Sequence, residues 1–386
     1  MFGRRDGLAP EGEGGLLMAH DHGRGPVDLA VVGAGVMGCA IAREAARAGA
    51  RVLLFDRDPA PARPLSPGTI SAQCDADAGD ALFDLRMRGR GQMPVWLATL
   101  EEETGLRIPR RSAGLLLPAM DLGELEALHG RASWQRRASL AFESMTGGTA
   151  RDREPGLSEE MVAALHLPDE KGLDAGALHN ALLHACAEAG VEVHLATPVL
   201  GVARAGGNVS GLYIPEGSVA AGAVVLAAGA WSGIAGLPSV PVEPRRLCIA
   251  MLAQSRGMRH GVWHPKVRLS PLPDGRLFVS GPLERAGFDT RVPALRIAEL
   301  LSAAVRVAPG VGELPLTGTG ATLVATTSDG MPLLGSTDAV NLLYATGFGE
   351  HASTVAPVVA ALLVEYLQTG QSGVDLSPFS PLRFVA

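Results

Sequence analysis

Residues 27–56 read VDLAVVGAGVMGCAIAREAARAGARVLLFD, and this stretch predicts a nucleotide-binding βαβ unit. The apolar run Val27–Val32 has the length and composition of a buried strand. Small and apolar residues then recur at helical spacing, and the second apolar run, Arg51–Phe55, ends in Asp56. This order is typical of a dinucleotide-binding fold, in which a carboxylate at the position of Asp56 can bind ribose hydroxyls.

Three glycines after the first strand, Gly33, Gly35 and Gly38, form the pattern G-x-G-x-x-G. The first permits a tight turn, the second lets the backbone approach a pyrophosphate, and the third lets the helix pack closely on the sheet. The free N–H groups at the helix start, around Val36 and Met37, present positive charge to the phosphates. The motif alone leaves open whether the dinucleotide is NAD or FAD.

The composition of the 386 residues, 47% of them hydrophobic, allows two or three domain-sized units. The net charge of −7 argues against a nucleic-acid partner, and the short basic cluster Arg107–Arg111 is interpreted as a solvated loop. Because no uninterrupted apolar run reaches about 18 residues, we expect no membrane span. The four cysteines are widely spaced without a C-x-x-C pair, so we expect no metal site and a cytoplasmic location.

The first 26 residues are glycine-rich and charged, with no apolar signal core. We expect residues 1–26 to form a flexible N-terminal extension, and Met18 is an alternative start.

Strands alternate with helical stretches along the rest of the chain, which predicts an α/β fold with a discontinuous Rossmann-type nucleotide domain. A β-rich α+β substrate domain is inserted into it. We predict the nucleotide domain at 27–104, 150–241 and 319–386, and the substrate domain at 105–149 and 242–318. The main predicted helices span 81–103, 122–128, 173–190, 294–305 and 354–368, and strands include 218–219, 223–228, 247–253 and 342–345.

Five collinear stretches give the chain a resemblance to the D-amino-acid oxidase-like FAD-dependent oxidoreductases, and most of all to their glycine oxidase-like branch. Together they extend from Val27 to Phe384, nearly the whole expected folded chain. They are the opening βαβ unit, GLDAGALHNALLHACAEAGVEVHLATPVLGV at 172–202, VVLAAGAWS at 224–232, PDGRLFVSGPLERAGFDTRV at 273–292, and the C-terminal set SDGMPLLG, LYATGFGEHASTVAP and DLSPFSPLRF.

The resemblance implies FAD rather than NAD, bound non-covalently, since 325–329 offers no cysteine or histidine for a covalent link. Near Gly347 and Gly349, the N-terminus of the last helix would face the flavin ring and stabilise its negative charge. Taken alone, that glycine-rich turn favours an ordinary entry into a helix over a cofactor contact. The positions implied for FAD are Gly33, Gly35, Val36, Met37, Gly38, Asp56, Arg57, Val199, Ala228, Gly229, Trp231, Gly347, Gly349, Glu350, His351 and Ala352.

The activity implied by the resemblance is oxidation of an amine or amino acid. A hydride leaves the α-carbon for flavin N5, an imine results, and the electrons pass to oxygen. No side-chain base is required, because the protein supplies orientation and electrostatics. The expected partners are a small amine or amino-acid substrate and either oxygen or a redox partner subunit; an oligomer is compatible with the sequence.

The chain departs from the branch on the substrate side. Val324 stands where the branch carries a carboxylate-binding arginine, and Arg268 stands where it carries a tyrosine. Glu350 and His351 replace an Arg-Asn pair, and the loop SPGTISAQCDADAG at 66–79 carries acids in place of small residues.

Three substrate-side residues are therefore candidates for catalysis or binding: Arg268, Glu350 and His351. Arg268 is either a replacement for the missing carboxylate contact or a surface strand residue. Glu350 and His351 would face a cationic or hydroxylated substrate, and His351 is either a proton relay or a solvated side chain near a helix N-terminus.

Three other function classes are compatible with parts of the sequence. They are an NAD-dependent dehydrogenase, the flavin-bearing subunit of a heteromeric amine or amino-acid dehydrogenase, and a degenerate non-catalytic flavoprotein. The C-terminal flavin-contact stretches argue against the first, and the departures around Val324 keep the third open.

Overall fold

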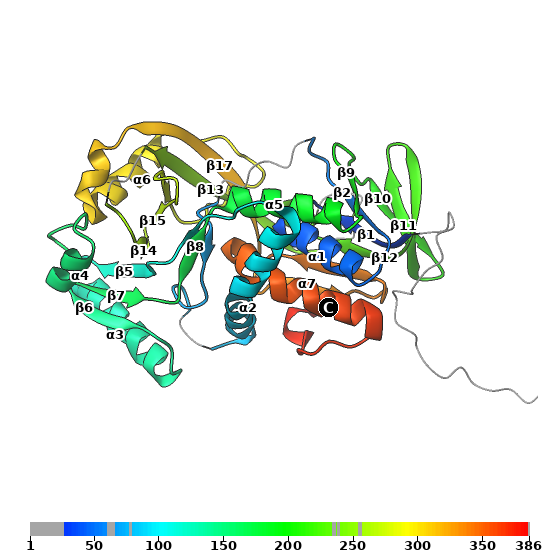
Figure 1. The fold of residues 1–386 in the computed structure, drawn as a ribbon, viewed down its shortest axis with the longest axis horizontal. Helices are drawn as coiled ribbons and strands as arrows, with labels where there is room; N and C mark the ends of the chain where they lie inside the picture. The colour runs from blue at the N-terminus through cyan, green and yellow to red at the C-terminus, as the bar shows by residue number, and fades with distance from the viewer. Residues whose placement is uncertain are drawn as a thin grey trace, which may run out of the picture.

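The structure is a computed structural model that describes residues 27–59, 66–76, 79–233, 237, 240–253 and 257–384. Figure 1 shows two large sheets side by side along the long axis of the molecule, each with its own helices. The expectations for residues 1–26 and for Met18 lie outside the described residues.

The first sheet has eight strands and contains the opening βαβ unit. Its parallel part runs in the order β9, β2, β1, β12 and β19, and the long strand β12 continues into an antiparallel extension with β11 and β10. The strands are β1 (Val27–Val32), β2 (Val52–Phe55), β9 (Glu192–His194), β10 (Gly201–Ala205), β11 (Asn208–Ile214), β12 (Gly217–Leu226), β18 (Leu333–Ser336) and β19 (Leu342–Thr346).

Four helices pack together beside this sheet and share one apolar core with it. They are α1 (Val36–Arg47), α2 (Ala81–Thr104), α5 (Ala175–Glu188) and α7 (Ala352–Thr369). Helix α1 contacts both α5 and α7, and α2 crosses α7 at Gly89, where a Cβ would collide with the Thr354 carbonyl oxygen. This close packing fixes the N-terminal turn of α7 against α2.

The segment Gly349–Thr369 is long and apolar enough to cross a membrane, although the sequence contains no 18-residue run without polar residues. In the fold, 61% of its most apolar window is buried inside the protein. The apolar residues of α7 pack in the shared core, which accounts for their hydropathy.

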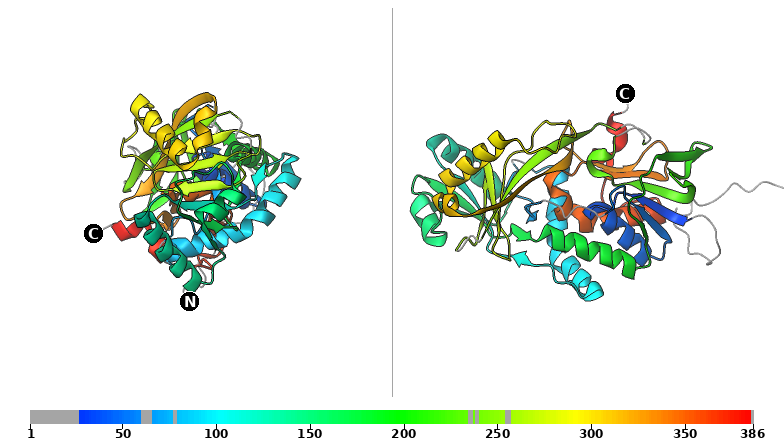
Figure 2. Two further views of the ribbon diagram at one scale, coloured as in Figure 1. Left: turned by 90° about the vertical axis from the view of Figure 1, so that its left-hand side faces the viewer. Right: turned by 90° about the horizontal axis from the view of Figure 1, so that it is seen from above.

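The second sheet also has eight strands, in the order β17, β13, β16, β15, β14, β5, β7 and β6. Figure 2 shows helix α6 on this half of the molecule and α7 on the other half. The strands are β5 (Leu115–Ala119), β6 (Glu143–Thr146), β7 (Ala163–Leu167), β13 (Val242–Leu252), β14 (Gly261–His264), β15 (Val267–Pro271), β16 (Leu277–Ser280) and β17 (Leu316–Thr327), with helices α3 (Leu122–Arg137), α4 (Gly147–Arg153) and α6 (Ala294–Val307).

A small third sheet lies in the chain segments that connect the two halves. It consists of β3 (Thr69–Ile70), β8 (Lys171–Leu173) and β4 (Arg110–Arg111). Through β3, it orders the loop that precedes α2.

The predicted α/β class is confirmed, with three local corrections. The helix predicted at 122–128 extends to Arg137, and the strands predicted at 218–219 and 223–228 belong largely to the single strand β12. The solvated-loop interpretation is wrong for Arg111, which is buried and donates from Nη1 to the Pro271 carbonyl at 3.1 Å. Burial lowers the pKa of the Arg111 guanidinium to about 10.

Strand pairing bears on where the two domains meet. Strand β7 pairs with β5 and β6 in the second sheet, although its residues fall within the segment predicted for the nucleotide domain. Strand β17 pairs with β13 in the same sheet, although the predicted boundary at 319 divides it. We propose that the substrate domain includes residues up to the end of β7 and, in its second segment, continues through β17.

Candidate functional site

A groove of about 420 Å³ runs along the glycine-rich turn at the carboxyl ends of β1 and β2. We call it the glycine groove. Open doubly wound sheets bind ligands at this edge, outside the carboxyl ends of their parallel strands. Its lining includes Gly33, Gly35, Phe55, Asp56, Arg57, Asp58, Thr197, Pro198, Val199, Leu200, Ala228, Gly229 and Trp231.

Two of the glycines are required by close packing of the backbone. Gly33 has a φ of +105°, and a Cβ there would lie 2.5 Å from the Ala227 carbonyl oxygen. A Cβ at Gly38 would collide with the carbonyl oxygen of Gly33, because α1 starts directly against the turn. Gly35 is the N-cap of α1 and faces open space, and no side chain caps this helix end. The first N–H groups of α1 are therefore free for an anion.

Asp56 holds the turn from the end of β2. Its carboxylate accepts a hydrogen bond from the backbone N–H of Ala34 at 2.7 Å and another from that of Asp58 at 2.9 Å. A carboxylate has about four acceptor sites, so Asp56 retains the capacity to accept hydroxyl hydrogens from a ligand in the groove. On the other side of the turn, Nε2 of the buried His179 donates to the Ala34 carbonyl at 2.6 Å. Burial lowers the pKa of His179, which favours the neutral ring.

At the far end of the groove, Arg57 stacks on Trp231, with its guanidinium carbon 4.6 Å from the ring centroid. The Trp231 ring also lies 6.1 Å from that of Phe288, at a tilt. This wall is flat and carries a cation.

A second cavity of about 260 Å³ adjoins the glycine groove, and both are lined by Gly35, Ala227 and Gly229. We call it the adjoining pocket. One wall comes from α1 and from the turn before α7, where Gly347 and Gly349 have φ angles of +79° and +59°. The opposite wall comes from the second sheet and is largely apolar, with Leu247, Trp263, Leu323 and Val324.

Glu350 and Arg268 form an ion pair at this pocket. The Nη1 atom of Arg268 lies 2.6 Å from Glu350 Oε1 and 3.3 Å from the Gly281 carbonyl oxygen, and the guanidinium lies 3.9 Å above the Trp263 ring. Both side chains are 16% exposed. Burial raises the pKa of the Glu350 carboxyl, and the Arg268 cation opposes that shift. The pair joins the turn before α7 to β15 of the second sheet.

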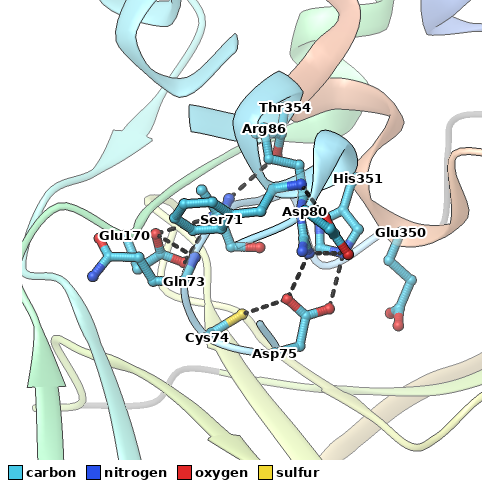
Figure 3. A network of polar contacts seen from close by, with 12 residues as sticks. Ser71, Gln73, Cys74, Asp75, Asp80, Arg86, Glu170, Glu350, His351 and Thr354 are labelled. Atoms are coloured by element: carbon cyan, nitrogen blue, oxygen red, sulfur yellow. Dashed lines mark hydrogen bonds and ion pairs between the residues drawn. The ribbon is translucent and has the colours of Figure 1, made fainter. Parts of the chain in front are cut away.

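His351 faces away from Glu350, as Figure 3 shows, into a cluster with Asp75 and Arg86. Its Nε2 atom lies 2.9 Å from Asp75 Oδ2, and Arg86 Nη1 lies 2.8 Å from Asp75 Oδ1. Burial acts to raise the pKa of Asp75, but His351 and Arg86 outweigh it and hold that pKa well below its usual range. The cluster ties the N-terminus of α7 to the loop before α2.

The same loop is clamped from the other side by the fully buried Glu170. Its carboxylate accepts the backbone N–H groups of Ala72 and Gln73 and lies 2.6 Å from Arg90 Nη1. Burial raises the pKa of Glu170 despite these partners. One acid of the 66–79 loop thus has a structural role, because Asp75 pairs with His351. Asp80, just beyond the loop, caps α2 by accepting the Phe83 N–H. Asp77 lies outside the described residues.

The structure brings together most of the residues predicted to hold a cofactor. Gly38 lies beneath the turn without lining either cavity, and neither Arg268 nor His351 lines the pocket. The remaining predicted positions line one cavity or both: Gly33, Gly35, Val36, Met37, Asp56, Arg57, Val199, Ala228, Gly229, Trp231, Gly347, Gly349, Glu350 and Ala352.

Sequence reasoning placed the 66–79 loop on the substrate side without naming the residues that line the pocket, and it missed the wall supplied by β14. Ser66, Thr69 and Ser71 come from the loop before α2, and Trp263 comes from β14. His179 was missed as well, although it lies within a stretch that carried the family resemblance. A single histidine at a helical position gives no signal until the fold places it against Ala34.

These cavities fit an extended dinucleotide with a flat ring at one end. The free N–H groups of α1 suit a pyrophosphate, Asp56 suits ribose hydroxyls, and the uncapped N-terminus of α7 suits a ring that gains negative charge on reduction. Among the described lining residues of both cavities there is no cysteine or histidine, the usual attachment points of a covalent flavin.

Comparison with known proteins agrees with this fit. Residues 28–366 match the family model described as "FAD dependent oxidoreductase". The glycine oxidase of Geobacillus kaustophilus is 27% identical, over 93% of this chain and 97% of that protein. A bifunctional protein ThiO/ThiG of Trichormus variabilis is 28% identical over 92% of this chain, which spans about half (55%) of that longer protein.

Solved structures show the same fold. The crystal structure of glycine oxidase from Geobacillus kaustophilus superposes with a TM-score of 0.89, covering 93% of this chain and 99% of that one at 27% identity. L-proline dehydrogenase from P. horikoshii shares the fold at a TM-score of 0.80 and 22% identity, covering 92% of this chain and 97% of that one. The matched family model, together with a groove shaped for a dinucleotide, shows that the chain belongs to the FAD-dependent oxidoreductase family and uses FAD as its cofactor.

Proposed function

We propose that this flavoenzyme oxidises the carbon–nitrogen bond of a small amine or amino acid and passes the electrons to oxygen. The observation that carries the proposal is the junction of the two cavities at Gly35 and Gly229. A dinucleotide lying in the glycine groove would extend its ring into the adjoining pocket, beside the N-terminus of α7. Relatives named glycine oxidase and D-amino acid dehydrogenase support this class of reaction.

The cofactor would be held mainly by backbone groups. The N–H groups at the start of α1 would bind the pyrophosphate and Asp56 would accept from the ribose, while Val199 and Trp231 border the far end of the groove. Bound FAD supplies a two-electron acceptor for the hydride that leaves the substrate α-carbon, so that the amine becomes an imine that water hydrolyses.

The chain's own residues position the substrate and exclude water. The apolar wall of Leu247, Trp263 and Val324 removes solvent from one side of the pocket. The N-terminus of α7, with no side-chain cap, stabilises negative charge at the pocket edge. We propose that His351 anchors this helix end through Asp75 rather than relaying a proton, because its ring lies outside the pocket lining.

Anaerobic mixing of the purified holoenzyme with a panel of amines and amino acids tests the proposal. We expect at least one compound to bleach the flavin absorbance near about 450 nm, and air to restore it with release of hydrogen peroxide. Bleaching without peroxide would replace oxygen by a partner acceptor. A flavin that no compound in the panel reduces would overturn the proposal.

A further inference from the structure

The charge of the adjoining pocket indicates which substrates it selects. Among the described residues that line it, Glu350 is the one charged side chain, and the lining contains no lysine or arginine. The rest of the substrate-facing wall is apolar or carries neutral hydroxyl groups, as at Val324 and Thr322. A buried carboxylate on a substrate would need a cation or several donors, since burying an unpaired charge is costly.

The nearest arginine, Arg268, is already occupied. One of its nitrogens contacts Glu350 at 2.6 Å and the Gly281 carbonyl oxygen at 3.3 Å, and its plane covers Trp263. A substrate carboxylate that shared this guanidinium would lie close to the negative charge of Glu350. Like charges in a poorly solvated site repel strongly, so the pair disfavours an anion.

Arg245 is the second candidate, because it lies directly across from Val324 in the β13–β17 pairing. Residues directly opposite in an antiparallel pair place their side chains on the same face of the sheet. The Arg245 guanidinium donates instead to Glu243 at 2.7 Å, and Arg245 is not among the residues that line the pocket. Neither arginine offers an unoccupied cation to the cavity.

Glu350, in contrast, keeps acceptor capacity toward the pocket. A carboxylate offers about four acceptor sites, and the contacts with Arg268 use only some of them. Arg268 stabilises the ionised form of Glu350 in a place where burial alone would favour the neutral acid. The result is an anchored carboxylate beside an apolar wall.

We propose that the substrate is an amine without a carboxylate on its reacting carbon, whose ammonium group is received by Glu350 and whose hydrocarbon part packs on Val324 and Trp263. Arg268 is a positioning residue that holds Glu350. The assignment rests on the proposed function for its chemistry, but the charge preference of the pocket can be measured by binding alone.

Aromatic ligands that share a phenyl ring and differ in the charged groups they carry provide the test. The holoenzyme is titrated with benzylamine, phenylglycine and benzoate, and binding is followed as a perturbation of the flavin spectrum under anaerobic conditions. We expect benzylamine to bind about tenfold or more tightly than either carboxylate. Tighter binding of phenylglycine or benzoate would overturn the proposal. Because this readout needs no turnover, failure of the oxidation reaction leaves it intact.

Variants then identify the residues responsible. Glu350→Gln should weaken benzylamine binding about tenfold, with a smaller effect for Glu350→Asp. The double change Val324→Arg with Glu350→Gln should reverse the preference in favour of phenylglycine, because it adds a free cation and removes the competing acid. FAD content and thermal unfolding check that each variant folds.

Arg245→Gln is the matched control, since it removes a cation across the strand pair and outside the pocket. Arg245→Gln should leave the affinities for benzylamine and for phenylglycine unchanged. If phenylglycine binding collapses in this variant, Arg245 binds the substrate carboxylate and the proposal is wrong.

Discussion

The glycine groove and the adjoining pocket meet at Gly35 and Gly229 but are built in different ways. The groove is made largely of backbone: a turn with no room for a Cβ at Gly38, a free helix end, and one carboxylate that binds two N–H groups. The pocket is made of side chains contributed by both sheets and held by ion pairs. Backbone geometry tolerates few substitutions, whereas a side-chain wall can change its charge while the fold is kept.

The largest expected effect is on the ion pair between Arg90 and the buried Glu170, which holds the loop before α2. Arg90→Met leaves the buried carboxylate of Glu170 without its cation and should lower the free energy of unfolding by about 3–5 kcal/mol. Loss of the cation raises the pKa of Glu170 further. The folded state then binds more protons than the unfolded state, so the variant loses stability as pH rises through that raised pKa.

Chemical denaturation at about pH 5 and about pH 8 measures both effects. Arg88→Met is the control, because Arg88 lies on the same helix and is exposed. Equal stability of the two variants would show that the Arg90–Glu170 ion pair contributes nothing to the free energy of unfolding.

A smaller loss is expected in the groove from Gly38→Ala, whose new Cβ would collide with the carbonyl oxygen of Gly33. We expect destabilisation of about 1–3 kcal/mol from the forced backbone shift, together with loss of bound FAD. Gly91→Ala is the matched control, because Gly91 also lies within a helix, α2, and a Cβ there would face open space. This change should stabilise the fold by about 0.5–1 kcal/mol. Thermal unfolding and flavin content compare the two; full FAD occupancy in Gly38→Ala would contradict the packing argument.

Substitution of Asp56 should change the affinity for FAD without a large change in fold stability. Asp56→Asn replaces the carboxylate that accepts the Ala34 N–H with a weaker acceptor. Since the same group would accept a ribose hydroxyl, FAD affinity should fall about tenfold. Asp56→Glu keeps the charge and should retain most of the affinity. Titration of the apoprotein with FAD, followed by flavin fluorescence, gives both dissociation constants, and an unchanged value for Asp56→Asn would remove Asp56 from the binding site.

The smallest effect is a change in acid sensitivity at the Asp75–His351 contact, which lies outside the pocket lining. Because the pKa of Asp75 is depressed in the fold, its stabilising contribution is present above its unfolded pKa and is lost as pH falls below about 4. Asp75→Asn should therefore lower Tm at neutral pH by a few degrees, and the difference from the unchanged protein should shrink toward acid. A difference that stays constant with pH would exclude an electrostatic role.

The groove was largely predictable because its determinants are local. Strand, turn, helix and second strand are consecutive, and the spacing of Gly33, Gly35 and Gly38 carries the steric reason for each. Collinear stretches then pointed to FAD, as the family match confirms. The length of α3 and the continuity of β12 were missed, because polar helices and strands of small residues give weak periodic signals.

For the adjoining pocket, the sequence predicted only which residues differ from those of the glycine oxidase-like branch. The sequence singled out Val324, Arg268, Glu350 and His351, but their separation along the chain gives no information on which side chains meet. Strand register placed Val324 opposite Arg245, packing placed Arg268 on Glu350, and the turn into α7 sent Glu350 and His351 in different directions.

The sequence by itself thus determined the α/β class and the nucleotide-binding turn, because short-range sterics and periodicity express them locally. It determined the cofactor family through the collinear stretches between Val27 and Phe384, since the glycine motif alone leaves NAD and FAD open. The tertiary structure alone decided the charge of the substrate pocket. Charge at a buried site depends on which partner each ionisable group meets. Arg268 from β15 and Glu350 from the turn before α7 become neighbours only when the two sheets pack together.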